Sequence, residues 1–122
     1  MSIADKISSY NRNRKWRLFS ESIYISNNVK VLDVGFSDKE YSQTDNYLEK
    51  HYLYSENITA LGIDEPNEFC RRYPTVEVVK YDGNTFPFDN RVFDVCWSNA
   101  VIEHVGNEDK QVLFLKEIKR TP

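Results

Sequence analysis

The stretch Val29-Lys30-Val31-Leu32-Asp33-Val34-Gly35 decides the fold of this chain of 122 residues. It is a β-branched, aliphatic run that closes on a glycine, which is typical of a strand ending in a turn. Similar runs follow at 58–63, 76–81 and 92–98. All four are nearly continuous in apolar residues, as expected of strands that are covered on both faces.

Helical patterns alternate with these strands. The sequence predicts three helices: one over 42–54 that Ser42 caps, one over 65–72, and one over 107–120 that Asn107 caps. In the last helix, the residues expected to face the core are Val112, Leu115 and Ile118. This order indicates an α/β protein with a Rossmann-like, mainly parallel sheet of about four strands and flanking helices. A hairpin at Asp82-Gly83 is rejected, because Pro87 does not suit a partner strand.

Composition excludes several classes of protein. The net charge is −3, which is no footprint of a nucleic-acid-binding chain, and the basic cluster at Arg12–Arg17 is interpreted as a solvated face. The longest uncharged stretches hold eight residues, whereas a membrane span needs about twenty. Cys70 and Cys96 belong to no metal-binding pattern, so we expect no zinc site and reduced thiols in a cytoplasmic protein. Two regions are expected, a helical segment over 1–28 and the α/β domain over 29–122.

Acidic residues stand at the ends of the first three strands, as Asp33, Asp64 and Asp82, and the fourth strand ends at Ser98-Asn99. In a parallel sheet these ends meet at one edge, where ligands bind. A single acidic residue in such a place caps a helix about as often as it binds a ligand. Three together predict a ligand that carries several hydrogen-bond donors.

Five segments in order resemble the motifs of class I S-adenosylmethionine-dependent methyltransferases, most closely the small-molecule group known as methyltransferase type 11. They are Val31–Gly35, Leu61–Asp64, Tyr81–Gly83, Phe86–Asp89 and Phe93–Val105. The resemblance covers about residues 29–120. It implies S-adenosylmethionine as cofactor and a small quinone-, lipid- or glycan-related molecule as methyl acceptor.

The resemblance also implies roles for matching positions. Asp33 would lie near the cofactor's ammonium group, Asp64 would accept the ribose hydroxyls, and Asp82 would accept from the adenine amino group. The full predicted cofactor site is Asp33, Gly35, Ser37, Asp64, Glu65, Asp82, Gly83, Ser98 and Asn99. His104 is a candidate general base, although a structural histidine is the commoner role.

Two departures from the family pattern keep an alternative open. The first loop reads Gly35-Phe36-Ser37-Asp38-Lys39 where the family has three alternating glycines, and Lys39 is expected to crowd it. The chain also matches only the first four of the family's seven strands, whose order is 3-2-1-4-5-7-6. The fourth strand would then be a sheet edge, open to a second copy or a partner chain. The alternative function is a non-catalytic module that keeps the fold and binds cofactor or protein.

Overall fold

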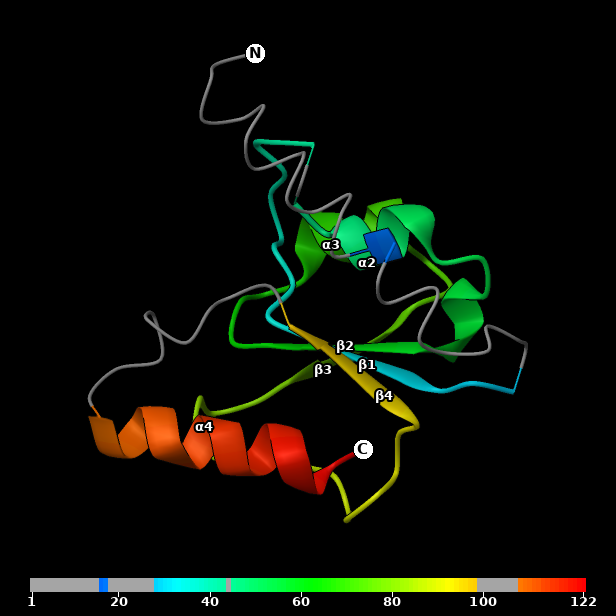
Figure 1. The fold of residues 1–122 in the computed structure, drawn as a ribbon. Coiled ribbons are helices and arrows are strands. Elements are labelled where there is room, and N and C mark those ends of the chain that lie inside the picture. Colours follow the sequence, from blue (N-terminus) through cyan, green and yellow to red (C-terminus); the bar gives the residue numbers. More distant parts are fainter. Residues whose placement is uncertain (1–15, 18–27, 44, 99–107) are drawn as a thin grey trace.

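The computed structural model describes residues 16–17, 28–43, 45–98 and 108–122 (Figure 1). Four parallel strands form one sheet in the order β3-β2-β1-β4. Their bounds are β1 Val31–Val34, β2 Ile58–Gly62, β3 Glu77–Lys80 and β4 Val95–Ser98. The predicted parallel sheet and its strand order are therefore confirmed, and β3 and β4 form no hairpin.

Helices cover both faces of this sheet (Figure 1). On one face lie α2 (Tyr47–His51) and α3 (Asn67–Arg72), with the 3-10 turn η1 (Ser55–Asn57) leading into β2. On the other face lies α4 (Glu108–Arg120). The crossover helices α2 and α3 thus share one face, and α4, which follows β4, covers the other. In such a sheet, ligands bind at the carboxyl ends of the strands.

Alternation along the strands divides the core into two clusters. Val31 of β1 packs under α2 and α3, in a cluster completed by Phe36, Tyr47, Leu48, Tyr52, Ile58, Ala60, Phe69, Val76 and Trp97. Leu32 and Val34 point to the α4 side, where they pack with Leu61, Phe86, Phe93 and Phe114. β1 is fully buried because both of its faces contribute to a core cluster.

The predicted helix over 42–54 is wrong in its bounds and in its cap. α2 begins only at Tyr47, because Asn46 has a φ of 52° and lies in the left-handed region. Ser42 donates its backbone N–H to the Asp45 carboxylate (3.1 Å) and caps no helix. The segment before α2 is therefore an ordered loop rather than a first helical turn.

The predicted inward face of α4 is wrong at two of its three positions. Val112 and Leu115 are 46% and 53% exposed, whereas Phe114 and Glu117 are buried. Ile118 is partly buried in the second cluster, as predicted. The predicted cap Asn107 lies outside the described residues.

The fourth strand is shorter than the predicted 92–98, since pairing with β1 covers only Val95–Ser98. Among the described strands, β4 pairs with β1 alone and forms one edge of the sheet. Attraction of a partner to this edge stays a prediction. Of the predicted segment 1–28, Trp16 packs on the first cluster, with ring centroids 6.1 Å from Tyr47 and 5.8 Å from Trp97.

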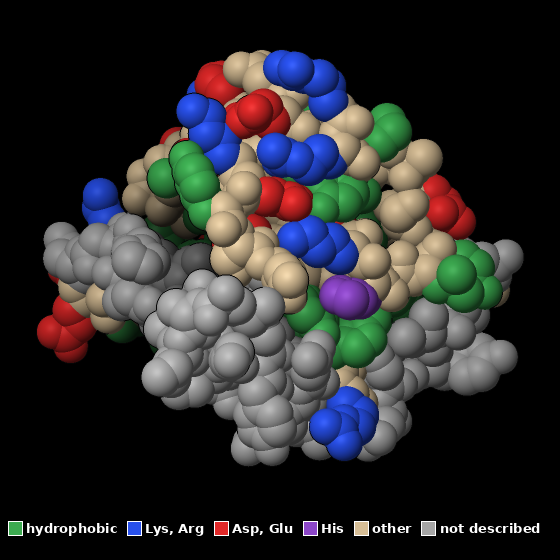
Figure 2. All heavy atoms as spheres, turned by 90° about the horizontal axis from the view of Figure 1, so that it is seen from above, with side chains coloured by type: hydrophobic (Ala, Val, Ile, Leu, Met, Phe, Trp, Pro, Cys, Tyr) green, Lys and Arg blue, Asp and Glu red, His purple; other side chains and the backbone are tan. Residues whose placement is uncertain are grey.

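The surface over α2 and α3 carries interspersed charges of both signs with smaller apolar areas between them (Figure 2). Such mixing gives the described part of this face no single-sign patch of the kind that binds nucleic acid. None of the helices that the structure describes combines the length and apolar character needed to cross a membrane.

Candidate functional site

A pocket of about 270 Å³ opens at the carboxyl ends of β1, β2 and β3. The described part of its wall is mostly apolar or aromatic, with Asp64 as its acidic side chain. The lining residues are Val34, Gly35, Phe36, Ser37, Gly62, Ile63, Asp64, Tyr81, Gly83 and Phe114. Apolar walls with a few polar groups are the usual composition of a small-molecule site.

Four predicted cofactor residues therefore meet in this pocket: Gly35, Ser37, Asp64 and Gly83. Asp64 lies two residues after the end of β2 and is exposed to solvent. Gly83 has a φ of 87°, and a Cβ on this residue would meet the Ile63 side chain only at 3.8 Å, so the backbone can approach a ligand closely. The pocket thus combines the Asp64 carboxylate with backbone at Gly83 that no side chain covers.

Of the other predicted residues, those that the structure describes do not line this pocket. Asp82 Oδ1 accepts hydrogen bonds from the backbone N–H groups of Asn84 (2.8 Å) and Thr85 (3.3 Å). The Asp82 side chain therefore stabilises a local turn. Asp33 is buried in β1, and Ser98 is half-buried at the end of β4. Their assignment to the cofactor stays a prediction.

Glu65 lies beside the pocket in a neighbouring hollow, which it shares with Ser37, Asp38, Lys39, Tyr41, Asp45 and Asp64. It forms an ion pair with Lys80. Asn99 and His104 lie outside the described residues. Among the residues that are described, no three His, Cys, Asp or Glu side chains are arranged to hold a metal ion.

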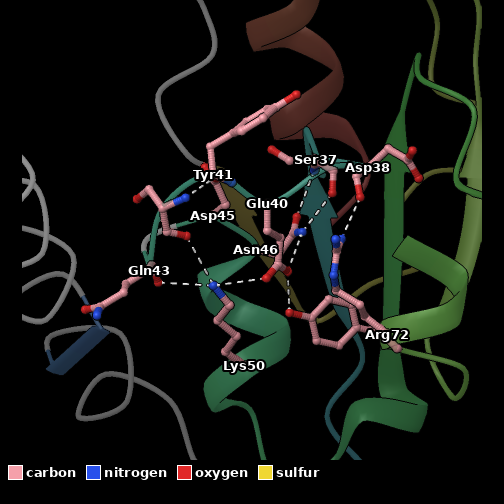
Figure 3. A network of polar contacts seen from close by, with 11 residues as sticks. Ser37, Asp38, Glu40, Tyr41, Gln43, Asp45, Asn46, Lys50 and Arg72 are labelled. Atoms are coloured by element: carbon pink, nitrogen blue, oxygen red, sulfur yellow. Dashed lines mark hydrogen bonds and ion pairs between the residues drawn. The ribbon is translucent and has the colours of Figure 1, made fainter. Parts of the chain in front are cut away.

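The loop that replaces the glycine-rich turn is held by side chains (Figure 3). Asn46 bonds both backbone groups of Ser37: its Oδ1 accepts the N–H and its Nδ2 donates to the C=O, each at 2.8 Å. The same Nδ2 donates to Glu40 (2.9 Å). Asp38 accepts two backbone N–H groups at the start of α3, and Arg72 donates to the Asp38 carbonyl (2.7 Å).

Lys39 does not strain this loop. Among the described residues, positive φ angles occur at Gly35, Gly83, Asn46 and Arg91. Lys39 is not among them, so its backbone needs no glycine-like conformation. The expected backbone strain at Lys39 is therefore wrong, because the positive φ of this segment falls on Asn46. That Lys39 hinders cofactor binding stays a prediction.

The charges around Glu40 make the loop network stable near neutral pH. Burial by itself would raise the pKa of Glu40, but hydrogen bonds from Tyr73 and Asn46 and the charge of Lys50 outweigh it and lower that pKa. Burial, followed by the bond to Glu40, raises the pKa of Tyr73 far above its usual value. Tyr73 therefore remains a neutral donor to an ionised Glu40.

Phe36 and Gly62 form the wall between the pocket and the first core cluster. A Cβ at position 62 would lie 2.6 Å from Cε1 of Phe36, so the ring rests directly on the glycine backbone. The ring also packs on Phe69, with centroids 4.8 Å apart. The sequence motifs did not single out Phe36, Tyr81 and Phe114 as lining residues, because an apolar aromatic side chain carries no signal that separates a pocket wall from the core.

Comparison with known proteins agrees with this geometry. A family model described as a methyltransferase domain matches residues 32–121, from the second residue of β1 to just beyond α4. No curated protein matches the chain. Because the family match spans most of the chain and the sheet has the expected strand order, the protein belongs to the class I S-adenosylmethionine-dependent methyltransferase domain family.

Proposed function

We propose that the pocket binds the nucleoside part of S-adenosylmethionine and that the domain transfers the methyl group to a small molecule. The observation that carries the proposal is the Asp64 carboxylate at the rim of an apolar pocket, with Gly83 on the next strand end. A carboxylate is an acceptor only and can receive both hydroxyls of a ribose. Ile63 and Tyr81 supply apolar surface for a base.

The residues present fit the nucleoside better than they fit the amino-acid end of the cofactor. The Gly35 N–H donates to Leu61 O (2.7 Å) and the Ser37 N–H donates to Asn46. These two backbone donors are already satisfied within the protein and are not available to a ligand carboxylate. The amino-acid end is therefore expected to be held by other groups.

When bound, the cofactor supplies a methyl group on a positively charged sulfur that a nucleophile can displace directly. The protein's part is to hold the two reactants in line and to exclude water. Asp64 orients the nucleoside, while Phe36 and Phe114 line the apolar wall. Positioning of this kind can supply most of the catalysis, so no base is required among the described residues.

Replacement of Asp64 by alanine is expected to weaken binding of the demethylated cofactor, S-adenosylhomocysteine, by about tenfold or more, because two hydroxyls lose a charged acceptor. Isothermal titration calorimetry measures the change. Glu77→Ala is the control, since Glu77 is also an exposed carboxylate of the same sheet but does not line the pocket. Equal affinities for the two variants would place the ribose elsewhere.

The acceptor and the turnover are tested separately from binding. Incubation with S-adenosylmethionine and a panel of quinols, lipids and glycans, followed by mass spectrometry, is expected to show a product heavier by one methylene. Binding without any product would favour the alternative, a cofactor-binding module without catalysis. A small acceptor and a cytoplasmic location are parts of this proposal; the acceptor rests on the resemblance, and the location on the two cysteines of the sequence, interpreted as reduced thiols.

A further inference from the structure

Glu49 of α2 is an acid that is buried against the sheet. Its side chain lies on the inner side of the helix and the residue is only 6% exposed. Neither carboxylate oxygen makes a hydrogen bond in the part of the chain that the structure describes. If this carboxylate were ionised, its burial without partners would destabilise the folded protein by several kcal/mol, about as much as the loss of a buried ion pair. The protonated form of Glu49 avoids this cost.

The neighbour that matters is Asp33 in β1. Asp33 is 3% exposed and follows Val31 by two positions, so its side chain points to the same face, toward α2. In the sheet it is flanked by Ala60 and Trp97. Two carboxyl groups that meet in such an apolar setting cannot both ionise at neutral pH.

The negative charges near Glu49 all favour its protonated form. Burial first, then the negative charge of Asp33 and finally that of Glu40 raise the pKa of Glu49 well above its usual value. Tyr73, from the end of α3, also interacts with Glu49 and is neutral. The nearby cation, Lys50, is paired with Glu40 (3.3 Å).

We propose that Glu49 keeps its proton in the folded protein and that its O–H donates a hydrogen bond to the Asp33 carboxylate, so that the pair carries one negative charge. The bond fixes the Asp33 carboxylate two residues before Gly35, which lines the pocket. Glu49 is thus a positioning residue that acts through Asp33. Its effect on ligand binding rests on the proposed function, whereas the shared proton does not.

The shared proton is tested on the protein alone. Side-chain carboxyl carbons are followed by NMR as pH is raised, in the wild type and in Asp33→Asn. Glu49 is expected to titrate above its usual value of 4.5 in the wild type and closer to that value in Asp33→Asn. A Glu49 that is ionised throughout the neutral range, or a midpoint that Asp33→Asn leaves unchanged, would overturn the proposal.

The same proton makes stability depend on pH. A group whose pKa is higher in the folded protein than in the unfolded chain contributes stability at pH values below the unfolded pKa. This contribution is lost as the pH rises from the unfolded pKa to the folded pKa. Glu49→Gln keeps a donor but cannot ionise. Relative to this variant, the wild type is therefore expected to lose about tenfold in its folding equilibrium per pH unit in that window. If the free energies of unfolding of the wild type and of Glu49→Gln changed with pH in the same way, the result would contradict the proposal.

The positioning role is tested with a matched pair of variants. Glu49→Gln can still donate to Asp33, whereas Glu49→Met fills similar space without a donor. For folded variants, we expect S-adenosylhomocysteine to bind Glu49→Gln within about twofold of the wild type and Glu49→Met about tenfold more weakly. Equal affinities would overturn the positioning role. Absence of binding to the wild type would overturn the proposed function, and the NMR titration would still decide the shared proton.

Discussion

Replacing Arg120 with alanine is expected to lower the free energy of unfolding by about 3 kcal/mol, because it leaves a buried carboxylate unpaired. Arg120 pairs with Glu117, which is 5% exposed and also accepts the Phe86 N–H (3.1 Å). The same guanidinium donates to the carbonyls of Phe86 (3.1 Å) and Phe88 (2.7 Å) and to Asn90 (2.9 Å). Urea unfolding followed by circular dichroism measures the loss.

Two controls separate this cluster from general effects on α4. Lys119→Ala removes an adjacent cation and is expected to change stability by less than about 0.5 kcal/mol. Arg120→Lys keeps the charge but not the planar fork that reaches several acceptors, so an intermediate loss is expected. If Arg120→Ala proved as stable as Lys119→Ala, the loop over 86–90 would be held by its aromatic residues alone.

Replacing Asn46 with alanine is expected to lower the free energy of unfolding by about 4 kcal/mol. The change removes three hydrogen bonds of about 1 kcal/mol each, two to Ser37 and one to Glu40. It also puts alanine in the left-handed region, which asparagine tolerates better, at a further cost of about 1 kcal/mol. Asn46 is 4% exposed, so water cannot readily replace the lost partners. Thermal unfolding monitored by circular dichroism gives the difference.

Asn46→Gly distinguishes the two contributions. Glycine adopts a φ near 52° without strain, so the loss that remains in this variant belongs to the hydrogen bonds. It is expected to be smaller than the loss in the alanine variant by about 1 kcal/mol. A glycine variant as stable as the wild type would show that the bonds to Ser37 contribute nothing.

The sheet could be predicted from sequence because its signals are local. Each strand is a short apolar run closed by a polar or glycine residue, and parallel pairing follows from the helices between the runs. The pocket followed from the same logic, since Gly35, Asp64 and Gly83 come shortly after three strands that end at one edge. These positions depend on the order of elements and not on the detail of any loop.

The features that sequence did not predict depend on contacts between distant polar groups. Glu117 was not placed in the core because an acid is normally exposed, yet Arg120 and the Phe86 N–H satisfy it there. That burial turns α4 so that Val112 and Leu115 face outward. Asn46 likewise makes the expected helix begin late, since its side chain bonds Ser37 from nine positions away. Polar pairs of this kind leave no periodic pattern in the sequence.

The reciprocal bonds between Lys30 and Asp94 bring the entrance of β1 against the entrance of β4 across 64 positions. Closing so long a segment costs chain entropy before any of its contacts can form. Strands β1, β2 and β3 follow one another along the chain and are joined by shorter crossovers. We therefore expect β4 to dock last during folding, after the other three have assembled. Pulse-labelling hydrogen exchange would show this as late protection of the Val95–Ser98 amides, and protection of β4 together with β1 would contradict it.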